Sequence, residues 1–258
     1  MDSLPQELID EIIGFLPLDR NLLSNCSLVA EPWRDISQKR LFRSVRTGPR
    51  NLRWWLDDIS RKNIKLLGYV RELTCFMEEL FTMQQIEPAH GTLQGHSPLL
   101  PQLKHFTLWY TDVQSLSWTR LISDFKYSLL TITLFHCTVS NVALVALINY
   151  FPNLKSLYLE DLSYTNSHES TSLSSRTLLE KLYVRDYIGS SLDLLNELSE
   201  LGLCSEEVAL SVFAFPDNLR TTFVNRVVRA FGASVKFLRL PQMSNSMSNP
   251  SYSYSGNS

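Results

Sequence analysis

The stretch LLTITLFHCTV at residues 129–139 decides the fold, because the spacing of its apolar residues returns along the chain. Leu129, Ile132 and Leu134 form the pattern apolar-x-x-apolar-x-apolar, and alternation of this kind is typical of a strand with one buried face. The same pattern occurs six more times, at Val70–Cys75, Leu103–Leu108, Leu154–Leu159, Leu179–Val184, Leu198–Leu203 and Val235–Leu240. We therefore expect a short strand at each of these places.

The repeat has a nearly constant period in the middle of the chain. Its copies at 103, 129, 154 and 179 start 26, 25 and 25 residues apart, and the apolar segment Asn141–Phe151 between two of them predicts a helix. A strand and a helix within this period resemble a leucine-rich repeat. Cys137 falls at the Asn/Cys position of that consensus, whereas the other copies are degenerate there, with Thr111, Leu162 and Tyr187.

Three short helices are predicted ahead of the repeats. Residues 3–18 form the first, with Ser3 as its N-cap, Pro5 in its first turn and Pro17 at its end. Asp19 caps the second helix and Pro32 starts the third. The first helix carries one wide apolar stripe, made of Leu8, Ile9, Ile12, Ile13 and Leu16.

The anchors of this segment resemble the F-box family in order and spacing. The family pattern has a Leu-Pro start, a Glu-Leu-x-x-x-Ile-x-x-x-Leu helix, then Leu-Leu, Ser-Leu-Val and Trp-Arg. This chain has Leu4-Pro5, Glu7-Leu8, Ile12, Leu16-Pro17, Leu22-Leu23, Ser27-Leu28-Val29, Trp33-Arg34 and Leu41-Phe42. It departs at Glu31-Pro32, where the family often has a cysteine or a basic pair.

The F-box resemblance implies docking onto a Skp-type adaptor and, through it, onto a cullin scaffold, a RING subunit and a ubiquitin-loaded E2. A three-helix unit of this size buries little apolar surface alone, and an exposed apolar patch usually marks an interface. Alternatively, these residues pack on the repeats that follow. The residues expected to contact the adaptor are Leu4, Pro5, Leu8, Ile12, Leu22, Val29 and Trp33.

The residues between the apolar anchors of each repeat are expected on a concave face opposite the core. Aromatic residues recur there, and solvent-facing aromatics with an arginine nearby are typical anchors of protein interfaces. In the alternative interpretation, a helix or loop covers them, or the register slips by one residue and they are core. The residues expected to contact a protein substrate are Trp109, Phe135, Tyr158, Tyr183 and Arg185.

The expected fold class is α/β, with a small three-helix F-box followed by an irregular leucine-rich-repeat-like solenoid of short parallel strands and helices. Its expected divisions are the F-box at 1–45, a basic linker and helix at 46–69, the repeats at 70–241 and a disordered tail at 242–258. The linker contains a predicted amphipathic helix at Asn51–Arg61, and it lacks a motif for reading nucleic acid. Polar loops are expected at 84–101 and at Ser163–Ser175.

Residues that carry chemistry are too scattered to predict catalysis, a metal site or a cofactor. The five histidines lack the spacing of metal ligands. His136 and Cys137 are neighbours in a predicted strand, so their side chains should point to opposite faces rather than form a dyad. The sequence has no CxxC motif, so we expect its cysteines to be buried thiols in a protein of a reducing compartment. They are Cys26, Cys75, Cys137 and Cys204.

The N-terminus has acidic residues where a signal peptide needs basic ones, and no apolar run approaches the ~20 residues of a membrane span. The net charge of −2 names no partner. We therefore expect a cytoplasmic or nuclear protein without nucleic-acid or membrane partners. Its expected role is the non-catalytic substrate-recognition subunit of an SCF-type ubiquitin ligase. The alternative is a repeat scaffold that binds the adaptor without ligase activity. A third possibility, an enzyme, is supported only by isolated histidines.

Overall fold

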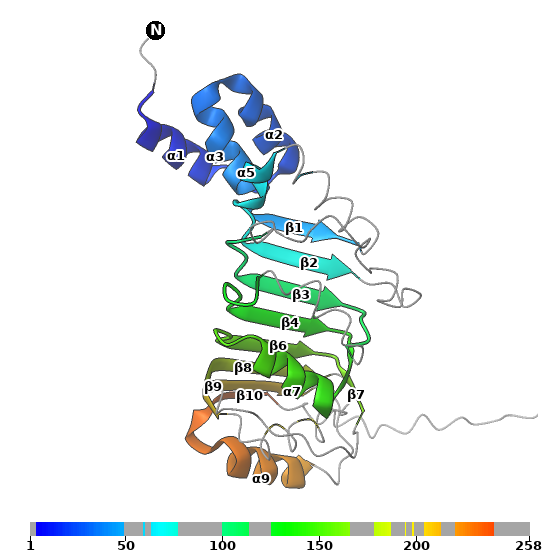
Figure 1. The fold of residues 1–258 in the computed structure, drawn as a ribbon. Coiled ribbons are helices and arrows are strands. Elements are labelled where there is room, and N and C mark those ends of the chain that lie inside the picture. The colour runs from blue at the N-terminus through cyan, green and yellow to red at the C-terminus, as the bar shows by residue number, and fades with distance from the viewer. Residues whose placement is uncertain are drawn as a thin grey trace, which may run out of the picture.

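The strands run parallel and stack one below another into a single long sheet, with a helical module beyond its first strand (Figure 1). The structure is a computed structural model, and it describes residues 4–48, 59, 63–76, 100–113, 125–165, 178–186, 194, 198, 204–212 and 220–239. The protein is therefore an α/β chain whose described strands in this sheet are all parallel.

The main sheet has eight strands among the described residues, in the order β1-β2-β3-β4-β6-β8-β9-β10. They are β1 (Ser44–Thr47), β2 (Glu72–Phe76), β3 (His105–Trp109), β4 (Thr131–Phe135), β6 (Ser156–Glu160), β8 (Leu178–Asp186), β9 (Cys204–Val212) and β10 (Val235–Arg239). A separate pair of short parallel strands consists of β5 (Thr138–Ser140) and β7 (Ser163–Thr165). Spatial order in the main sheet follows chain order, as expected for stacked repeats.

The predicted register is confirmed in the central strands. In β3, β4 and β6 the second and fourth residues are buried and the others are partly or fully exposed. The pairing places buried residues beside buried residues, for example Ile132 between Phe106 and Leu157. Because side chains alternate along a strand, one face of the sheet is core and the other is left open.

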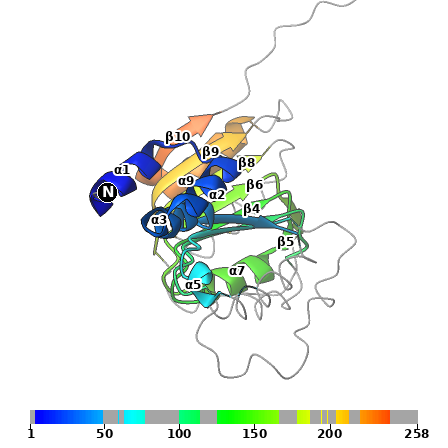
Figure 2. The same ribbon diagram turned by 90° about the horizontal axis from the view of Figure 1, so that it is seen from above.

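Helix α7 (Asn141–Tyr150) lies where the sequence predicts a helix, and it covers the core face (Figure 2). Ser140 is its N-cap and its hydroxyl accepts a hydrogen bond from the Ala143 amide at 3.2 Å. Its buried Leu144 and Leu147 join the same apolar cluster as the strands. The short helix α5 (Ile64–Leu67) lies on the same side, and α9 (Arg220–Phe231) and the 3₁₀ turn η3 (Gly232–Ser234) precede β10.

The helical module has a core of its own. It contains α1 (Gln6–Phe15), α2 (Arg20–Val29) and α3 (Glu31–Leu41). Ile9, Ile13, Leu23 and Ile36 form a buried cluster that is separate from the cluster of the sheet. Within the described residues, no helix is long and apolar enough to cross a membrane.

The module joins the sheet through a very short connection. Helix α3 ends at Leu41 and β1 begins at Ser44, so only two residues separate them. Beyond this connection, the Lys39 ammonium lies 6.0 Å from the centre of the Tyr69 ring. Partial burial and, secondarily, the Asp35 carboxylate of α3 raise the pKa of Tyr69. The module therefore contacts the sheet side of the chain as well as being tethered to it.

One predicted strand is misplaced, and one observed strand was not predicted. Leu198 lies in a helix, and the strand expected at Leu198–Leu203 is β9, where Val208 and Leu210 pair with Leu182 and Val184. Leu182 and Val208 are 26 residues apart, so the period of the repeat continues in β9. The leucines at 198, 201 and 203 have the spacing of a strand but do not form the strand of this repeat. The basic linker also begins with a strand that was not expected. This strand, β1, crosses the proposed boundary at residue 45.

Smaller differences concern the ends of elements. Helix α1 begins at Gln6 with Pro5 as its N-cap residue, whereas Pro5 was expected inside the first turn and Ser3 lies outside the described residues. The polar loop predicted at Ser163–Ser175 starts with strand β7. Three other predictions fall outside the described residues almost entirely: the helix at 51–61, the loop at 84–101 and the tail at 242–258.

Candidate functional site

Apolar side chains remain exposed on the helical module although it has a core. We call this set the module patch, and its members are between 40% and 82% exposed: Leu4, Leu8, Ile12, Phe15, Leu18, Leu28 and Val29. Helix α1 has a buried face and an exposed face, and Ile9 and Ile13 lie on the buried one. Leu8, Ile12 and Phe15 lie on the exposed face at spacings of four and three. Exposed Glu7 directly precedes Leu8, and exposed Asp10 and Glu11 lie between Leu8 and Ile12 in the sequence.

The seven residues predicted to contact an adaptor fall into two groups. Leu4, Pro5, Leu8, Ile12 and Val29 are exposed. Leu22 and Trp33 are half-buried, and Trp33 packs against the module core. The sequence interpretation missed three exposed residues, Phe15, Leu18 and Leu28. For Phe15 the signal was present, because its spacing from Leu8 and Ile12 continues the outer face of the helix.

The second candidate surface is the side of the sheet opposite α7, which we call the open face. Register pairing arranges its side chains in rows across the strands. The row at the carboxyl ends of the strands contains Phe76, Trp109, Phe135, Glu160, Arg185, Ser211 and Arg239, of which Ser211 is buried. The next row contains Arg46, Thr74, Thr107, Thr133, Tyr158, Tyr183, Ala209 and Phe237.

All five predicted substrate-contact residues lie on this open face and are half-buried. The structure separates them into groups rather than one site. The Trp109 ring lies between those of Phe135 and Phe76 and is tilted against both, with its centre 3.8 Å from the Phe135 centre and 5.3 Å from the Phe76 centre. We call these three rings the aromatic row. Tyr158 and Tyr183 form a second contact at 5.8 Å, one row away.

The residues that follow three of these strands extend the surface. Tyr110, His136 and Asp161 come directly after β3, β4 and β6, and each has a positive φ of 51–54°. Their amides continue the pairing, since His136 N–H donates to the Glu160 carbonyl at 2.9 Å. A residue with a side chain rarely adopts this conformation, so three equivalent cases mark a feature built into the repeat.

The positive φ also brings side chains together that a regular strand would separate. The Tyr110 and His136 rings stack 5.1 Å apart, and His136 makes an edge contact with Phe135 at 4.4 Å. The expectation that His136 lies in a strand is therefore wrong, because β4 ends at Phe135. Cys137 is fully buried while His136 is partly exposed, so the two do not form a dyad.

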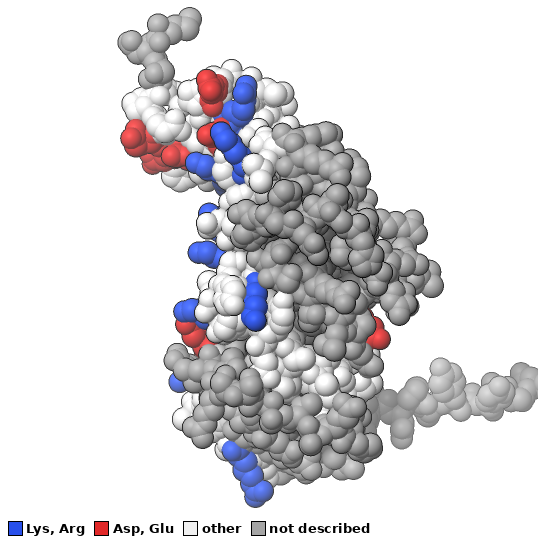
Figure 3. Space-filling view, viewed as in Figure 1, with Lys and Arg blue, Asp and Glu red and all other residues white. Residues whose placement is uncertain are grey.

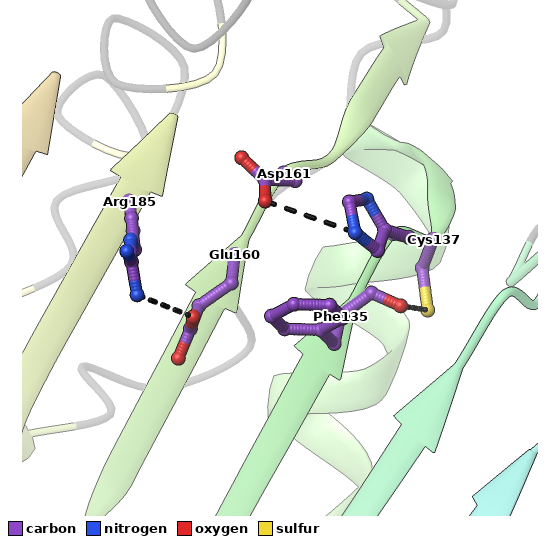
Figure 4. Close-up of polar contacts among 6 residues, drawn as sticks. Phe135, Cys137, Glu160, Asp161 and Arg185 are labelled. Carbon is purple, nitrogen blue, oxygen red and sulfur yellow. Dashed lines mark hydrogen bonds and ion pairs between the residues drawn. The ribbon is translucent and has the colours of Figure 1, made fainter. Parts of the chain in front are cut away.

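Charged groups follow the aromatic row directly (Figure 4). The Glu160 carboxylate lies 3.6 Å from Nη1 of Arg185, and the Asp161 carboxylate lies 3.9 Å from Nε2 of His136. Partial burial is the main cause that raises the pKa of Glu160, with Asp161 adding to it and with Arg185 and His136 acting against it. Glu160 is thus a carboxylate that has already lost part of its hydration.

The buried thiols offer no reactive group. Burial raises the pKa of Cys75 to about 12 and that of Cys137 to about 11. The Cys137 thiol lies 3.5 Å from the Phe135 carbonyl and 3.6 Å from the Leu108 carbonyl, so it serves the core between two repeats. Thr111 and Leu162 occupy equivalent buried positions after β3 and β6, as the repeat predicts.

Within the described part of the chain, no three His, Cys, Asp or Glu side chains gather closely enough to hold a metal ion. Two of the five histidines, His105 and His136, can be placed, because the other three, His90, His96 and His168, fall outside that part. No protein-family model matches this chain, and no curated protein matches it either. Function must therefore be argued from the module patch and the open face.

Proposed function

We propose that this chain is an F-box protein, the substrate-recognition subunit of an SCF-type ubiquitin ligase. In this proposal the module patch docks on a Skp-type adaptor, and a leucine-rich-repeat-like domain behind it binds a protein substrate through the open face. The chain itself supplies no catalytic group. It raises the local concentration of a substrate lysine near the E2 thioester.

The observation that carries the proposal is the division of apolar residues within the helical module. Four buried residues form its core, yet seven other apolar residues stay exposed, including Phe15 at 82% and Leu28 at 77%. Removing apolar surface from water contributes about 25 cal/mol per Å², so leaving so much exposed is costly unless a partner covers it. None of the seven lies in the apolar cluster of the sheet, which argues against packing on the repeats.

The surroundings of the module patch suit a protein partner. Charged side chains of both signs occur on the module (Figure 3), and three acidic residues lie among the apolar ones in the first half of α1. An apolar centre with a charged rim is the usual composition of a protein interface. The anchors that resemble the F-box pattern supply the identity of the partner.

Affinity capture tests the proposal in cells. Tagged wild type should retain the Skp-type adaptor and the cullin, whereas a Leu8→Ser, Phe15→Ser variant should lose both while keeping its circular dichroism spectrum. Val228→Ser is a matched control, because Val228 is 54% exposed on α9 at the other end of the sheet. Retention of the adaptor by the double variant would contradict the proposal.

The alternative function is an adaptor-bound scaffold without ligase activity. Reconstitution of the complex with E1, E2 and a protein captured by the open face separates the two. Ubiquitination of that protein supports the ligase. Binding without any modification, in a complex whose cullin is active on another substrate, favours the scaffold.

A further inference from the structure

We propose that the sheet binds an acidic segment of a partner protein at the edge where its first three strands begin, next to the helical module. We call this surface the basic edge, and it consists of Arg43, Arg71 and Lys104. Aspartate and glutamate side chains of the partner lie across these three cations. As a statement about the substrate, this inference rests on the proposed function and names the chemistry of one segment that the chain recognises.

The three cations occupy equivalent positions, each directly before a strand. The Arg43 carbonyl accepts hydrogen bonds from the Arg71 and Glu72 amides at 2.8 and 3.0 Å, and the Arg71 carbonyl accepts from the Lys104 and His105 amides at the same distances. Because neighbouring strands are about 4.8 Å apart, three positive charges belong to backbone positions that span only about 10 Å. Figure 3 shows blue side chains along the side of the sheet where the strands begin, just below the module.

Further along the same side of the sheet, each lysine is matched by a glutamate. Leu130 takes the next position of the row, and Lys155 and Glu180 follow it and form an ion pair. Lys181 pairs with Glu207 at 3.6 Å. Opposite charges on neighbouring strands stabilise a sheet and like charges destabilise it. The basic edge departs from this arrangement, so an anionic partner relieves a repulsion that the later repeats avoid.

Among the described residues, the one carboxylate in ion-pair contact with the basic edge is that of Glu72. Its Oε1 lies 3.9 Å from Nε of Arg43, and the Glu72 and Arg43 side chains are 41% and 65% exposed. Water and salt screen a pair of this kind, so it neutralises little. Lys104 is exposed and has no ion pair within the described part of the chain.

Arg71 is held in position before a partner arrives. Its Nη1 lies 3.3 Å from the Gly68 carbonyl and 3.4 Å from the Gln102 carbonyl and donates to both. These contacts orient the guanidinium without neutralising its charge, and four of its five N–H donors remain for a carboxylate. A side chain that is already fixed loses little entropy on binding.

The extent of the basic edge favours an acidic protein segment over nucleic acid. Nucleic-acid surfaces combine a broad basic field with aromatic rings on which bases stack. The Lys155–Glu180 ion pair ends the surplus of cations, and the aromatic row lies at the other ends of the strands, roughly 16 Å away. An extended peptide places side chains about 6.8 Å apart on one side, so a run of acidic residues meets several of the cations at once.

Peptide titration monitored by NMR on the full-length protein tests the inference. The probe is a Gly/Ser peptide with a run of glutamates, compared with the same peptide carrying glutamines and with a single-stranded oligonucleotide of equal charge. We expect saturable shifts of the Glu72 and Lys104 amide signals with the glutamate peptide. The glutamine peptide should bind about tenfold more weakly or less, and the oligonucleotide no more tightly than the glutamate peptide.

Three results would overturn the inference. They are equal affinity of the two peptides, tighter binding of the oligonucleotide, and no shift with the glutamate peptide up to about 5 mM. Tighter binding of the oligonucleotide would identify the basic edge as a nucleic-acid surface instead.

Two variants with the same change of charge locate the contact. Arg43→Gln, Lys104→Gln should weaken binding of the glutamate peptide about fivefold. Arg229→Gln, Lys236→Gln removes one arginine and one lysine from exposed positions of α9 and β10, at the other end of the sheet, and should leave the affinity nearly unchanged (Figure 1). An equal loss in the two variants, or no loss in the first, would overturn the assignment.

A further measurement separates this inference from the proposed function. The Leu8→Ser, Phe15→Ser variant changes the module patch and leaves the basic edge intact, so it should lose the adaptor and still bind the glutamate peptide. Adaptor binding by wild type without peptide binding refutes the basic edge alone, and the reverse result refutes the module patch alone.

Discussion

Individual residues on this chain are placed by the repeat as much as by their own chemistry. Cys137 takes the position that Thr111 and Leu162 occupy in neighbouring copies, and all three are buried. Burial raises the pKa of the Cys137 thiol because it disfavours the thiolate. Hydrogen bonds with the Thr111 and Phe135 backbones lower this pKa and only partly offset the effect of burial. A buried thiol of this kind serves packing and is inert.

The raised pKa predicts how stability depends on alkaline pH. Above the ordinary thiol pKa near 9, the unfolded chain releases the Cys137 proton while the folded chain retains it until about 11. The free energy of unfolding therefore falls with rising pH in this window, by roughly 1 kcal/mol between pH 9 and pH 10 for this thiol. Urea titrations of wild type and Cys137→Ala at both pH values isolate this difference. An equal loss in the two proteins would contradict it.

At the scale of elements, the caps of two helices carry local stability in different parts of the molecule. The Asp19 carboxylate accepts a hydrogen bond from the Leu22 amide at 2.9 Å and starts α2, as the sequence predicts. Ser140 does the same for α7. Each satisfies one of the amides that a helix start leaves unpaired.

Removing each cap should have a local effect. Asp19→Ala should cost about 1 kcal/mol in the helical module, and Ser140→Ala a similar amount in the sheet domain. Amide hydrogen exchange measures both: faster exchange is expected in α2 alone for the first variant and around α7 alone for the second. Uniform acceleration along the chain would show that the two parts unfold together.

The elements were predictable wherever a local pattern decides them. The strands β2, β3, β4, β6 and β8 lie at their expected apolar triplets, and α7 matches the apolar segment between two of them. β9 was misplaced because Leu198, Leu201 and Leu203 imitate the triplet, while Val208 and Leu210 carry the period. Four-residue β1 has too short a pattern to be detected without its neighbour β2.

The candidate site was predictable only in part, for a related reason. Alternation assigned Trp109, Phe135, Tyr158, Tyr183 and Arg185 to the open face correctly. It could not include Tyr110, His136 and Asp161, because their positive φ breaks the alternation at the ends of the strands. Contacts across strands, such as that of Tyr110 with His136, follow from register, which one repeat alone does not fix.

At the scale of the whole molecule, two separate cores meet at a two-residue connection. The helical module, which carries the module patch, and the sheet domain, which carries the open face, are therefore joined by a short connection. In the proposed function this geometry helps to hold a bound substrate at a defined distance from the ligase.

Separate cores predict separable stability. Ile13 is fully buried in the module core, so Ile13→Ala should destabilise the module by about 2–5 kcal/mol while the strands remain protected. Hydrogen exchange of this variant should rise in α1, α2 and α3, with β3, β4 and β6 unchanged. Loss of protection in the central strands would show one cooperative unit instead.

Calorimetric titration with the purified Skp-type adaptor is the most direct test of the proposal that the module patch binds it. Leu8→Ala, Ile12→Ala, Phe15→Ala combined truncate one exposed face of α1 and spare its core residues. Most single truncations at an interface cost less than about 1 kcal/mol, so for the three combined we expect Kd to rise by about tenfold or more. An unchanged Kd in a folded variant, or no binding by the wild type, would contradict this role of the module patch.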